Sequence, residues 1–331
     1  MQSMQKTAVE QIFQILDDTA ILLKNELDCT YLEALAETGE NLYHDQVLQE
    51  EVSEVNKKRL VKNYEEAKRI KYTKEDMRKA FQLACLKGMR ENIQPNHQMT
   101  PDTIGIFMSY LIGKFMKDRK SFSLLDPAIG SANLMTTILN QLQSFTIDSI
   151  GIDIDDVLIH LAYVNANLVE QPIQLFNQDS LENLYVDPVD VVVSDLPVGY
   201  YPNDVRASEF ALKADSGHSY AHHLMIEQSC HYTKEGGYLF FIVPNGLFES
   251  SEAPKLNKFI KEHLYIQAFI HLPESMFKNK NLAKSILVLQ KKGADIKSPK
   301  EVLLASMPSL TNKQHLQSFF NKLNDWVQEN K

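Results

Sequence analysis

The strongest constraint on the fold is an alternation that begins after residue 120, where short apolar runs are separated by amphipathic stretches. The runs are "FSLLD", "SIGID", "IQLF", "DVVVSD", "GYLFFIVP" and "IQAFIHLP". Strands that alternate with helices are typical of βαβ units, whose strands lie parallel in one sheet. The alternation therefore predicts an α/β domain built on a mostly parallel, doubly wound sheet.

The end of the chain departs from this pattern. "IQAFIHL", residues 266–272, and "SILVLQK", residues 285–291, are separated by a loop that has no convincing helical period. A parallel return needs a long crossover, so these two strands are expected to pair antiparallel as a C-terminal hairpin. The last ~40 residues indicate one more strand and one amphipathic helix, which Trp326 is expected to pack onto the domain.

The first part of the chain has a different period. Apolar residues such as Ile12 and Leu16 recur at helical spacing, and few glycines or prolines interrupt them. The segment "IQPNHQMTPDT" then ends the helical pattern with two prolines. We predict a helical N-terminal domain over residues 1–94 and a second domain over residues 95–331.

Composition narrows the class of protein. The chain has 331 residues, 44% of them hydrophobic, and no apolar run approaches the ~20 residues that span a bilayer. We expect a cytoplasmic protein without a membrane partner, because no secretory signal pattern opens the sequence. Three scattered cysteines without a C-x-x-C pair argue against a disulfide framework or a zinc site and are expected to be buried thiols: Cys29, Cys85 and Cys230.

The charge is unevenly distributed. The net charge of −9 disfavours a large nucleic-acid surface, since phosphate neutralisation requires Lys and Arg. Residues 56–80 nevertheless carry 10 Lys and Arg against 4 Asp and Glu, a local excess of 6. This stretch is either a solvated helical face or a phosphate-binding stripe.

Polar residues follow the ends of the predicted strands. In "LLDPAIGSANLM" a strand ends at Asp126, a loop containing Gly130 follows, and a helix is expected to start near Asn133. Such a turn brings backbone close to a ligand and directs helix N–H groups at it. The dinucleotide fingerprint G-x-G-x-x-G does not fit, because Gly130 is the only glycine in the loop. Alone, the loop is equally consistent with a structural turn.

The next two strands also end in acids. Asp153, in "GIDID", stands where acids accept hydrogen bonds from ribose hydroxyls in nucleotide-binding sheets. Asp155 is expected to cap the helix that follows. Asp179, in "FNQDSL", could reach an adenine amino group or could serve as a turn residue. Together with the Gly130 loop, Asp153 favours a cofactor that contains a nucleoside.

The fourth strand ends in "VVVSDLPVGYY", residues 191–201, which places the Asp195 carboxylate at the edge where open α/β sheets bind ligands. Pro197 stiffens the loop and Gly199 permits close approach. A carboxylate and a loop carbonyl can accept both hydrogens of an exocyclic amine. The nitrogen lone pair is then less conjugated with its ring and becomes more nucleophilic.

The order of these features resembles that of the N6-adenine DNA methyltransferases, particularly the modification subunit of type I restriction systems. The matching motifs are Asp126-Pro127-Ala128-x-Gly130-Ser131, Gly151-Ile152-Asp153, Asp179 and Asp195-Leu196-Pro197. The similarity extends to "MTPDTIGIFM", "GGYLFFIVPNGLF" and "LPESMF…AKSILVLQKK", and so covers about residues 95–292. Among stand-alone members the chain is most similar to the short YtxK-type proteins. The resemblance implies a Rossmann-like class I fold that depends on S-adenosylmethionine.

The resemblance also implies roles for individual residues. Asp126 and the backbone around Gly130 would hold the methionine end of S-adenosylmethionine, Asp153 the ribose and Asp179 the adenine. The full set of implied cofactor-binding residues is Thr100, Pro101, Asp126, Ala128, Gly130, Ser131, Asp153, Ile154, Asp179, Ser180 and Asp195. Catalysis would fall to Asp195, Leu196 and Pro197, and acceptor binding to Val198, Gly199 and Tyr200.

The chain departs from the family pattern at several positions. The fourth motif of the family is Asn or Asp, Pro, Pro, then Tyr or Phe, whereas Leu196 and Val198 stand here at the second and fourth places. The missing aromatic ring would stack on a flipped-out base, and Tyr200 or Tyr201 is the candidate replacement. Ala132 replaces the usual last glycine of the first motif, which adds a methyl group. Gln98-Met99 precedes Thr100 in place of the usual aromatic pair.

Several functions therefore stay open. The acceptor is an adenine amine in DNA or another nucleic acid, or another planar nitrogen in RNA, protein or a small molecule. A cofactor-binding regulatory protein without transfer activity is a third alternative, and a nicotinamide dehydrogenase is disfavoured by the missing glycines. The helical N-terminal domain is expected to serve dimerisation, a partner protein or nucleic acid. Three clustered histidines are disfavoured as a metal site, and we predict no metal: His218, His222 and His223.

Overall fold

The computed structural model describes residues 6–91, 99–277 and 282–330. These residues form two compact units, and each unit is made of segments that are not contiguous in the sequence. The first unit comprises Met1–Ile106, Ile129–Gln143 and Gly151–Asn177. The second comprises Phe107–Ala128, Ser144–Ile150 and Gln178–Lys331. The predicted division at residue 94 lies outside the described residues and stays a prediction.

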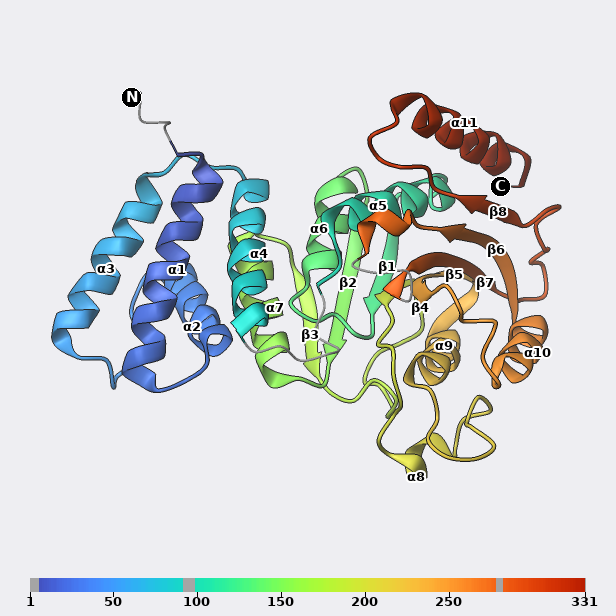
Figure 1. Cartoon of the computed structure of the whole chain (residues 1–331), viewed down its shortest axis with the longest axis horizontal. Helices are drawn as coiled ribbons and strands as arrows, with labels where there is room; N and C mark the ends of the chain where they lie inside the picture. The colour runs from blue at the N-terminus through green and yellow to red at the C-terminus, as the bar shows by residue number, and fades with distance from the viewer. Residues whose placement is uncertain (1–5, 92–98, 278–281, 331) are drawn as a thin grey trace. The chain divides into compact units, whose positions relative to one another are not determined.

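The helical prediction for the first part of the chain is confirmed by four helices (Figure 1). They are α1 (Ala8–Leu27), α2 (Tyr31–His44), α3 (Glu54–Arg69) and α4 (Lys74–Glu91). The first two begin at capping boxes, because Thr7 and Thr30 are each followed three residues later by a glutamate.

The first unit is built around one apolar core. Its buried side chains come from α1 to α4 and from α7 (Asp156–Leu168), for example Leu16, Leu35, Phe81 and Leu161. Helix α2 packs against α7 at Gly39, where an added Cβ atom would lie 2.1 Å from Cγ1 of Val164. Helix α6 (Asn133–Gln141) and strand β3 (Ile173–Asn177) complete the regular elements that lie wholly in this unit.

An eight-stranded sheet with the order β3-β2-β1-β4-β5-β7-β6-β8 confirms the α/β prediction. The remaining strands are β1 (Ser121–Asp126), β2 (Thr146–Asp153), β4 (Val189–Asp195), β5 (Thr233–Pro244), β6 (Leu264–His271), β7 (Lys284–Lys291) and β8 (Leu303–Ser306). Strand β4 runs parallel to β1 and β5. Strand β7 is antiparallel to β5 and to β6, which confirms the predicted C-terminal hairpin.

The second unit also contains helices. They are α8 (Asp204–Ala207), α9 (Ala221–His231), α10 (Ala253–His263) and α11 (Lys313–Asn330), with a 3₁₀ turn at Glu274–Met276 and with α5 (Asp102–Phe115) shared between the units. Helix α9 contacts β5 and α10 contacts β6. Trp326 on α11 is buried and its ring lies 6.0 Å from that of Phe115, as the sequence predicted.

None of the helices in the described part of the chain is both long and apolar enough to cross a membrane. Cys85 and Cys230 are buried, as expected, but Cys29 is half-buried, so the prediction for that thiol was wrong. Burial raises the pKa of the Cys230 thiol to about 11, which leaves it protonated at neutral pH.

Candidate active site

The end of β1 carries a buried carboxylate. Asp126 is 1% exposed, and its Oδ1 accepts hydrogen bonds from the backbone N–H of Ala128 at 3.0 Å and from the Ser194 hydroxyl at 2.9 Å. Ser194 lies on β4, which pairs with β1 through Leu124 and Val191. The parallel pairing therefore brings the first and fourth predicted motifs together at the carboxyl edge of the sheet.

The loop after β3 is tied to the same edge. The Ser180 hydroxyl donates to the backbone oxygen of Pro127, which directly follows Asp126. Asp179 accepts from the backbone N–H of Leu181 at 2.9 Å and from the Tyr201 hydroxyl at 2.6 Å. Burial and the hydrogen bond to Asp179 raise the pKa of Tyr201, which stays a neutral donor. Three loops of the second unit are thus joined by side-chain hydrogen bonds.

The predicted catalytic loop begins with an ion pair. Oδ1 of Asp195 accepts a hydrogen bond from Nζ of Lys284 at 2.6 Å, and both side chains are largely buried. Leu196 is buried and its N–H donates to the backbone oxygen of Ile242 on β5, so the loop continues the sheet for one residue. Pro197 is half-buried, and Val198 is 43% exposed.

The two tyrosines of this loop have different environments. Tyr201 is buried and bonded to Asp179, whereas Tyr200 is 63% exposed. The Tyr200 ring stacks on Tyr220, with ring centroids 5.1 Å apart and planes inclined by 15°. A backbone bridge between the same two residues, and a hydrogen bond from the Ala221 N–H to the Gly199 oxygen, hold the pair in place. Of the two candidate replacements for the missing ring, only Tyr200 is exposed.

The first unit contains the glycine loop and the ribose candidate. The N–H of Gly130 donates to Oδ2 of Asp153 at 2.8 Å, and Oδ1 of Asp153 accepts from the Asp155 N–H at 3.0 Å. Asp155 caps α7 through the Leu158 N–H, as predicted. Gly130 has φ +55°, and no heavy atom lies within 4 Å of the position that a Cβ would take. This open backbone fits the close approach of a cofactor.

Helix α6 begins immediately after this loop, at Asn133, as the sequence predicted. The residue before it, Ala132, is fully buried in the left-handed conformation, with φ 61° and ψ 18°. Besides the added methyl group, alanine here brings backbone strain, because a non-glycine residue is disfavoured in that conformation.

The Thr-Pro segment lies next to the same helix start. Thr100 is buried, and its backbone oxygen accepts from the Asn133 amide at 3.0 Å. Pro101 is exposed, and its oxygen accepts from the N–H groups of Ile104 and Gly105 at the start of α5. Ser131 is buried, and Ile154 is 68% exposed. Gln98 lies outside the described residues.

The clustered histidines have separate surroundings. His218 is exposed and pairs with Asp204 at 3.0 Å, whereas His222 and His223 are buried on α9 with ring centroids 4.8 Å apart. Burial lowers the pKa of both buried histidines to about 4, and for His222 the charge of His223 adds to this effect. Over the described ranges, no group of three or more His, Cys, Asp or Glu side chains could hold a metal ion.

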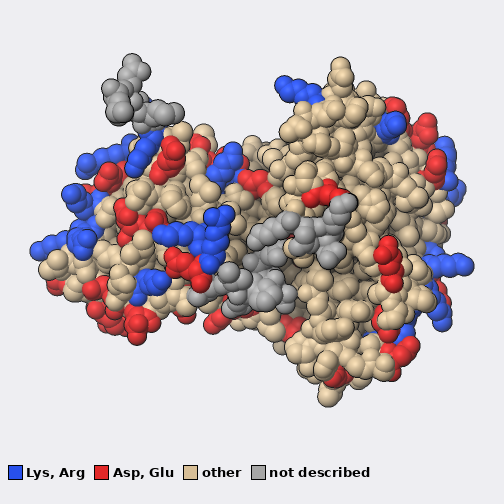
Figure 2. Space-filling model, in the orientation of Figure 1, with Lys and Arg blue, Asp and Glu red and all other residues tan. Residues whose placement is uncertain are grey.

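The basic stretch of residues 56–80 is balanced by acids. Lys and Arg side chains lie among Asp and Glu side chains over the N-terminal helices (Figure 2). Four of them form ion pairs, with Glu54, Asp45, Glu170 and Glu75: Lys57, Lys68, Lys74 and Lys79. Arg78 is only 1% exposed and cannot contact phosphate. The other cations of the stretch are exposed, so both interpretations, a solvated face and a phosphate-binding stripe, stay open.

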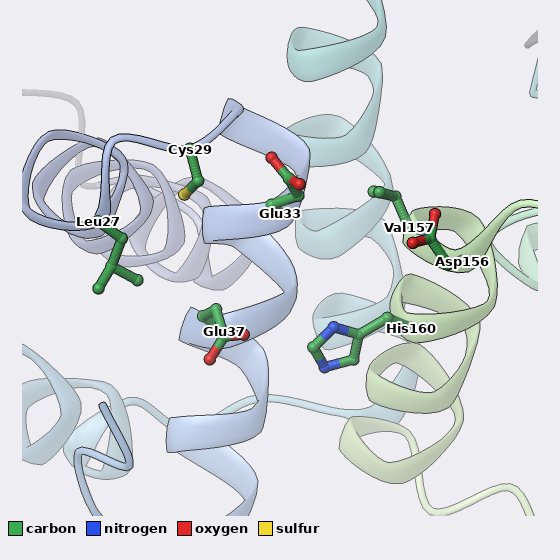
Figure 3. A pocket seen from close by; sticks show the side chains of 7 residues that line it. All are labelled: Leu27, Cys29, Glu33, Glu37, Asp156, Val157 and His160. Carbon is green, nitrogen blue, oxygen red and sulfur yellow. The ribbon is translucent and has the colours of Figure 1, made fainter. Parts of the chain in front are cut away.

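A pocket in the first unit lies apart from the predicted site residues (Figure 3). It is lined by Leu27, Cys29, Glu33, Glu37, Asp156, Val157 and His160. The His160 ring lies 3.0 Å from Glu40, an acid of α2. No predicted site residue lines this pocket.

Several residues outside the predicted set contact predicted site residues directly, and one more contacts them through Asn133. Tyr201 binds Asp179, Lys284 binds Asp195, and Asn133 binds Thr100. Arg78 in turn binds Asn133. Only Tyr201 and Asn133 had a local signal, since they follow a predicted motif directly. The partners of Arg78 and Lys284 are distant in sequence, and no spacing rule points to them.

Comparison with known proteins places the chain in a family. Residues 10–89 match the YtxK N-terminal helical domain, and residues 96–328 match the N-6 DNA Methylase family. The uncharacterised protein YtxK of Bacillus subtilis is 51% identical over 329 residues, which is 99% of this chain and 100% of that protein.

Two solved structures illustrate the range of similarity. A candidate class I S-adenosylmethionine-dependent methyltransferase from Listeria monocytogenes is 49% identical with a TM-score of 0.90, covering 97% of this chain and 99% of that one. The methyltransferase subunit of a type I restriction-modification system from Streptococcus thermophilus shares the fold at 15% identity and a TM-score of 0.67, covering 98% and 76%. The match over most of its length shows that the chain belongs to the N-6 DNA Methylase family.

Proposed function

We propose that this protein transfers a methyl group from S-adenosylmethionine to an exocyclic amine of adenine in nucleic acid. The observation that carries the proposal is the joining of three loops by hydrogen bonds at the carboxyl edge of the sheet. Ser194 binds Asp126, Ser180 binds Pro127 and Tyr201 binds Asp179. Family membership supports the cofactor, and the position of Asp195 on the fourth strand supports the reaction type.

The predicted residues have the chemistry that the groups of the cofactor require. The open backbone at Gly130 and the Asp153 carboxylate would take the methionine end and the ribose. Asp179 and Ser180 would take the adenine, while Asp126 stiffens the loop that leads to Gly130. When bound, S-adenosylmethionine supplies an electrophilic methyl group on a sulfonium.

The loop after β4 would orient the acceptor. The Asp195 carboxylate and the Leu196 carbonyl would accept the two amine hydrogens, so that the lone pair points away from ring conjugation. S-adenosylmethionine bound beside this loop would supply the methyl group to that nitrogen, and its sulfur would leave with the electrons of the broken bond. The product nitrogen releases one proton, for which Asp195 is the base on this loop. Orientation of the two reactants supplies most of the rate in such a transfer.

Lys284 has a defined place in this scheme, because its ammonium group fixes the Asp195 carboxylate through a 2.6 Å hydrogen bond. We predict that Lys284→Met lowers kcat about tenfold, since a charge-assisted hydrogen bond is worth roughly 1.5–3 kcal/mol. The dissociation constant of S-adenosylmethionine should stay unchanged. A fall in cofactor affinity with an unchanged kcat would contradict this role.

Tyr200 is the proposed stacking residue for the acceptor base in place of the ring that Val198 lacks. One face of its ring is stacked on Tyr220 and its side chain is exposed. A base that stacks on an aromatic ring gains roughly 1–3 kcal/mol. Tyr200→Ala should therefore raise KM for nucleic acid while leaving cofactor affinity unchanged.

Two measurements test the proposal. Calorimetry should detect S-adenosylmethionine binding in the micromolar range, and the absence of binding by folded protein would refute the cofactor. Radiolabelled methyl should then enter unmodified DNA with the unaltered protein but not with Asp195→Ala. The matched control is Asp204→Ala, which removes an exposed acid from the same region. Equal incorporation of labelled methyl by Asp195→Ala and Asp204→Ala would refute the assignment of Asp195.

The same assay separates the remaining acceptors. Transfer into RNA or protein but not DNA would assign the acceptor elsewhere. Cofactor binding without transfer into any of them would identify a regulatory protein. The N-terminal helices are proposed to serve dimerisation, a partner protein or nucleic acid.

A further inference from the structure

A buried arginine connects the N-terminal helices to the starts of two helices of the predicted cofactor site. Arg78 on α4 is 1% exposed. Its Nη1 donates to Oδ1 of Asp102 and to Oδ1 of Asn133, both at 3.0 Å, and its Nη2 donates to Oδ2 of Asp102 at 2.7 Å. Glu75 accepts from Nε at 2.8 Å and from Nη2 at 2.7 Å. The guanidinium is therefore satisfied on all of its nitrogen atoms.

Two of the residues that Arg78 binds lie next to segments of the predicted cofactor site. Asp102 is the first residue of α5 and directly follows Thr100 and Pro101. Asn133 is the first residue of α6 and follows the Gly130 loop. The Asn133 amide donates to the Thr100 oxygen at 3.0 Å, so one side chain joins both segments. Arg78 fixes the orientation of that amide, since it occupies the Asn133 oxygen.

Arg78 also determines the pKa values of the two carboxylates that it contacts. Burial alone would raise the pKa of Asp102, but the hydrogen bonds and charge of Arg78 outweigh it and the pKa is lowered. The hydrogen bond and charge of Arg78 likewise lower the pKa of Glu75 to about 2, although partial burial opposes the shift. Removal of the arginine would leave Glu75 with Lys79 at 3.5 Å and would take away the cation that lowers the pKa of Asp102, which is costly for a partly buried carboxylate.

We propose that Arg78 is a positioning residue that makes the affinity for S-adenosylmethionine depend on helix α4. The proposal rests on the proposed function. Arg78 holds the Thr100-Pro101 segment and the start of α6 in one arrangement before the cofactor binds. Because these segments are already ordered in the folded protein, cofactor binding loses less conformational entropy, and the affinity for S-adenosylmethionine is higher.

The first test compares Arg78→Met with Leu60→Ala. Leu60 is a fully buried residue of α3 in the same helical core, so its truncation also lowers the melting temperature. We expect Arg78→Met to weaken S-adenosylmethionine binding roughly tenfold, the factor that corresponds to one lost charge-assisted hydrogen bond. Leu60→Ala should bind the cofactor as the unaltered protein does. Equal affinity of both variants at matched stability would overturn the proposal.

The second test needs no cofactor. Amide hydrogen exchange of the ligand-free protein should rise in residues 99–106 and 130–136 of Arg78→Met, and not in Leu60→Ala. Unchanged exchange in both segments would also overturn the proposal. If exchange rises but the unaltered protein binds no S-adenosylmethionine, the proposed function fails and the positioning role stands.

If Arg78→Met does not fold, a variant that removes an uncharged contact of the same cluster can replace it. The Gln82 amide donates to Oδ1 of Asp102 at 2.7 Å and carries no charge. Gln82→Leu should therefore raise exchange in the same two segments by a smaller factor. Arg78→Lys keeps the charge but loses the planar fork, so it should recover only part of the affinity.

Discussion

At the scale of single residues, Ala132 is the most constrained position of the glycine loop. It combines φ 61° with complete burial, and glycine occupies this place in the family pattern. Relief of left-handed strain, worth roughly 1–2 kcal/mol, is offset in Ala132→Gly by a lost buried methyl and a freer unfolded chain. Ala132→Gly should therefore change the free energy of unfolding by less than about 1 kcal/mol.

Ala132→Val is the informative partner of that variant. A β-branched side chain fits the left-handed conformation poorly and would also overfill a closed site, so we expect a loss of at least about 2 kcal/mol. Urea unfolding of both variants measures the difference. A valine variant as stable as the glycine variant would show that the backbone leaves this conformation at little cost.

The residues that the sequence could locate are those that end a strand. Asp126, Asp153 and Asp195 close apolar runs, and hydrophobic alternation fixes where such runs stop. Contacts between side chains far apart in the sequence could not be predicted in this way. Lys284 and Asp195 are 89 residues apart, and Arg78 and Asn133 are 55 apart. Such pairs depend on how whole helices and strands pack, and the hydrophobic periodicity of one segment does not predict them.

At the scale of elements, α9 carries two buried histidines that make the stability of the protein depend on pH. The pKa values of His222 and His223 fall to about 4 on folding, from an ordinary value near 6.5. A lowered pKa means that the unfolded chain binds protons more readily than the folded one. The stabilising contribution is therefore complete above pH 6.5 and is lost as the pH falls from 6.5 towards 4.

We predict that acidification from pH 8 to pH 5 costs on the order of 2 kcal/mol per buried histidine. Replacing both by leucine (H222L/H223L) should flatten the pH dependence of the free energy of unfolding between these values. The control is His218→Ala, which removes a histidine whose side chain is 61% exposed. An unaltered slope in the double variant would show that other groups govern acid stability.

The strands were the easiest elements to predict, and the reason is physical. Buried parallel strands need continuous apolar runs, and each run here appears as a strand within a few residues of its predicted bounds. The left-handed turn at Ala132 was not predictable, because alanine rarely adopts it and the strain is compensated by the surrounding packing.

At the scale of the whole molecule, the N-terminal helices and α7 share one core. Leu158, Leu161, Val164 and Val169 of the α7 region are buried together with side chains of α1 to α4. A chain that starts at residue 95 would expose this apolar face of α7. Large exposed apolar patches promote association.

We therefore predict that residues 95–331 alone are aggregated or poorly folded, although the methylase family match begins at residue 96. Size-exclusion chromatography and near-UV circular dichroism of the full and shortened chains provide the comparison. A monomeric shortened chain with native tertiary signals would support the predicted boundary at residue 94 as a limit of independent folding.

The placement of Arg78 on α4 has a consequence for any molecule that binds the N-terminal helices. If such a molecule shifts the equilibrium between arrangements of α4, it changes the affinity for S-adenosylmethionine by some factor. Thermodynamic linkage then requires S-adenosylmethionine to change the affinity for that molecule by the same factor. Under this scheme occupancy of the cofactor site would be transmitted outward, and a molecule bound to the N-terminal helices would bind more or less tightly according to the concentration of S-adenosylmethionine.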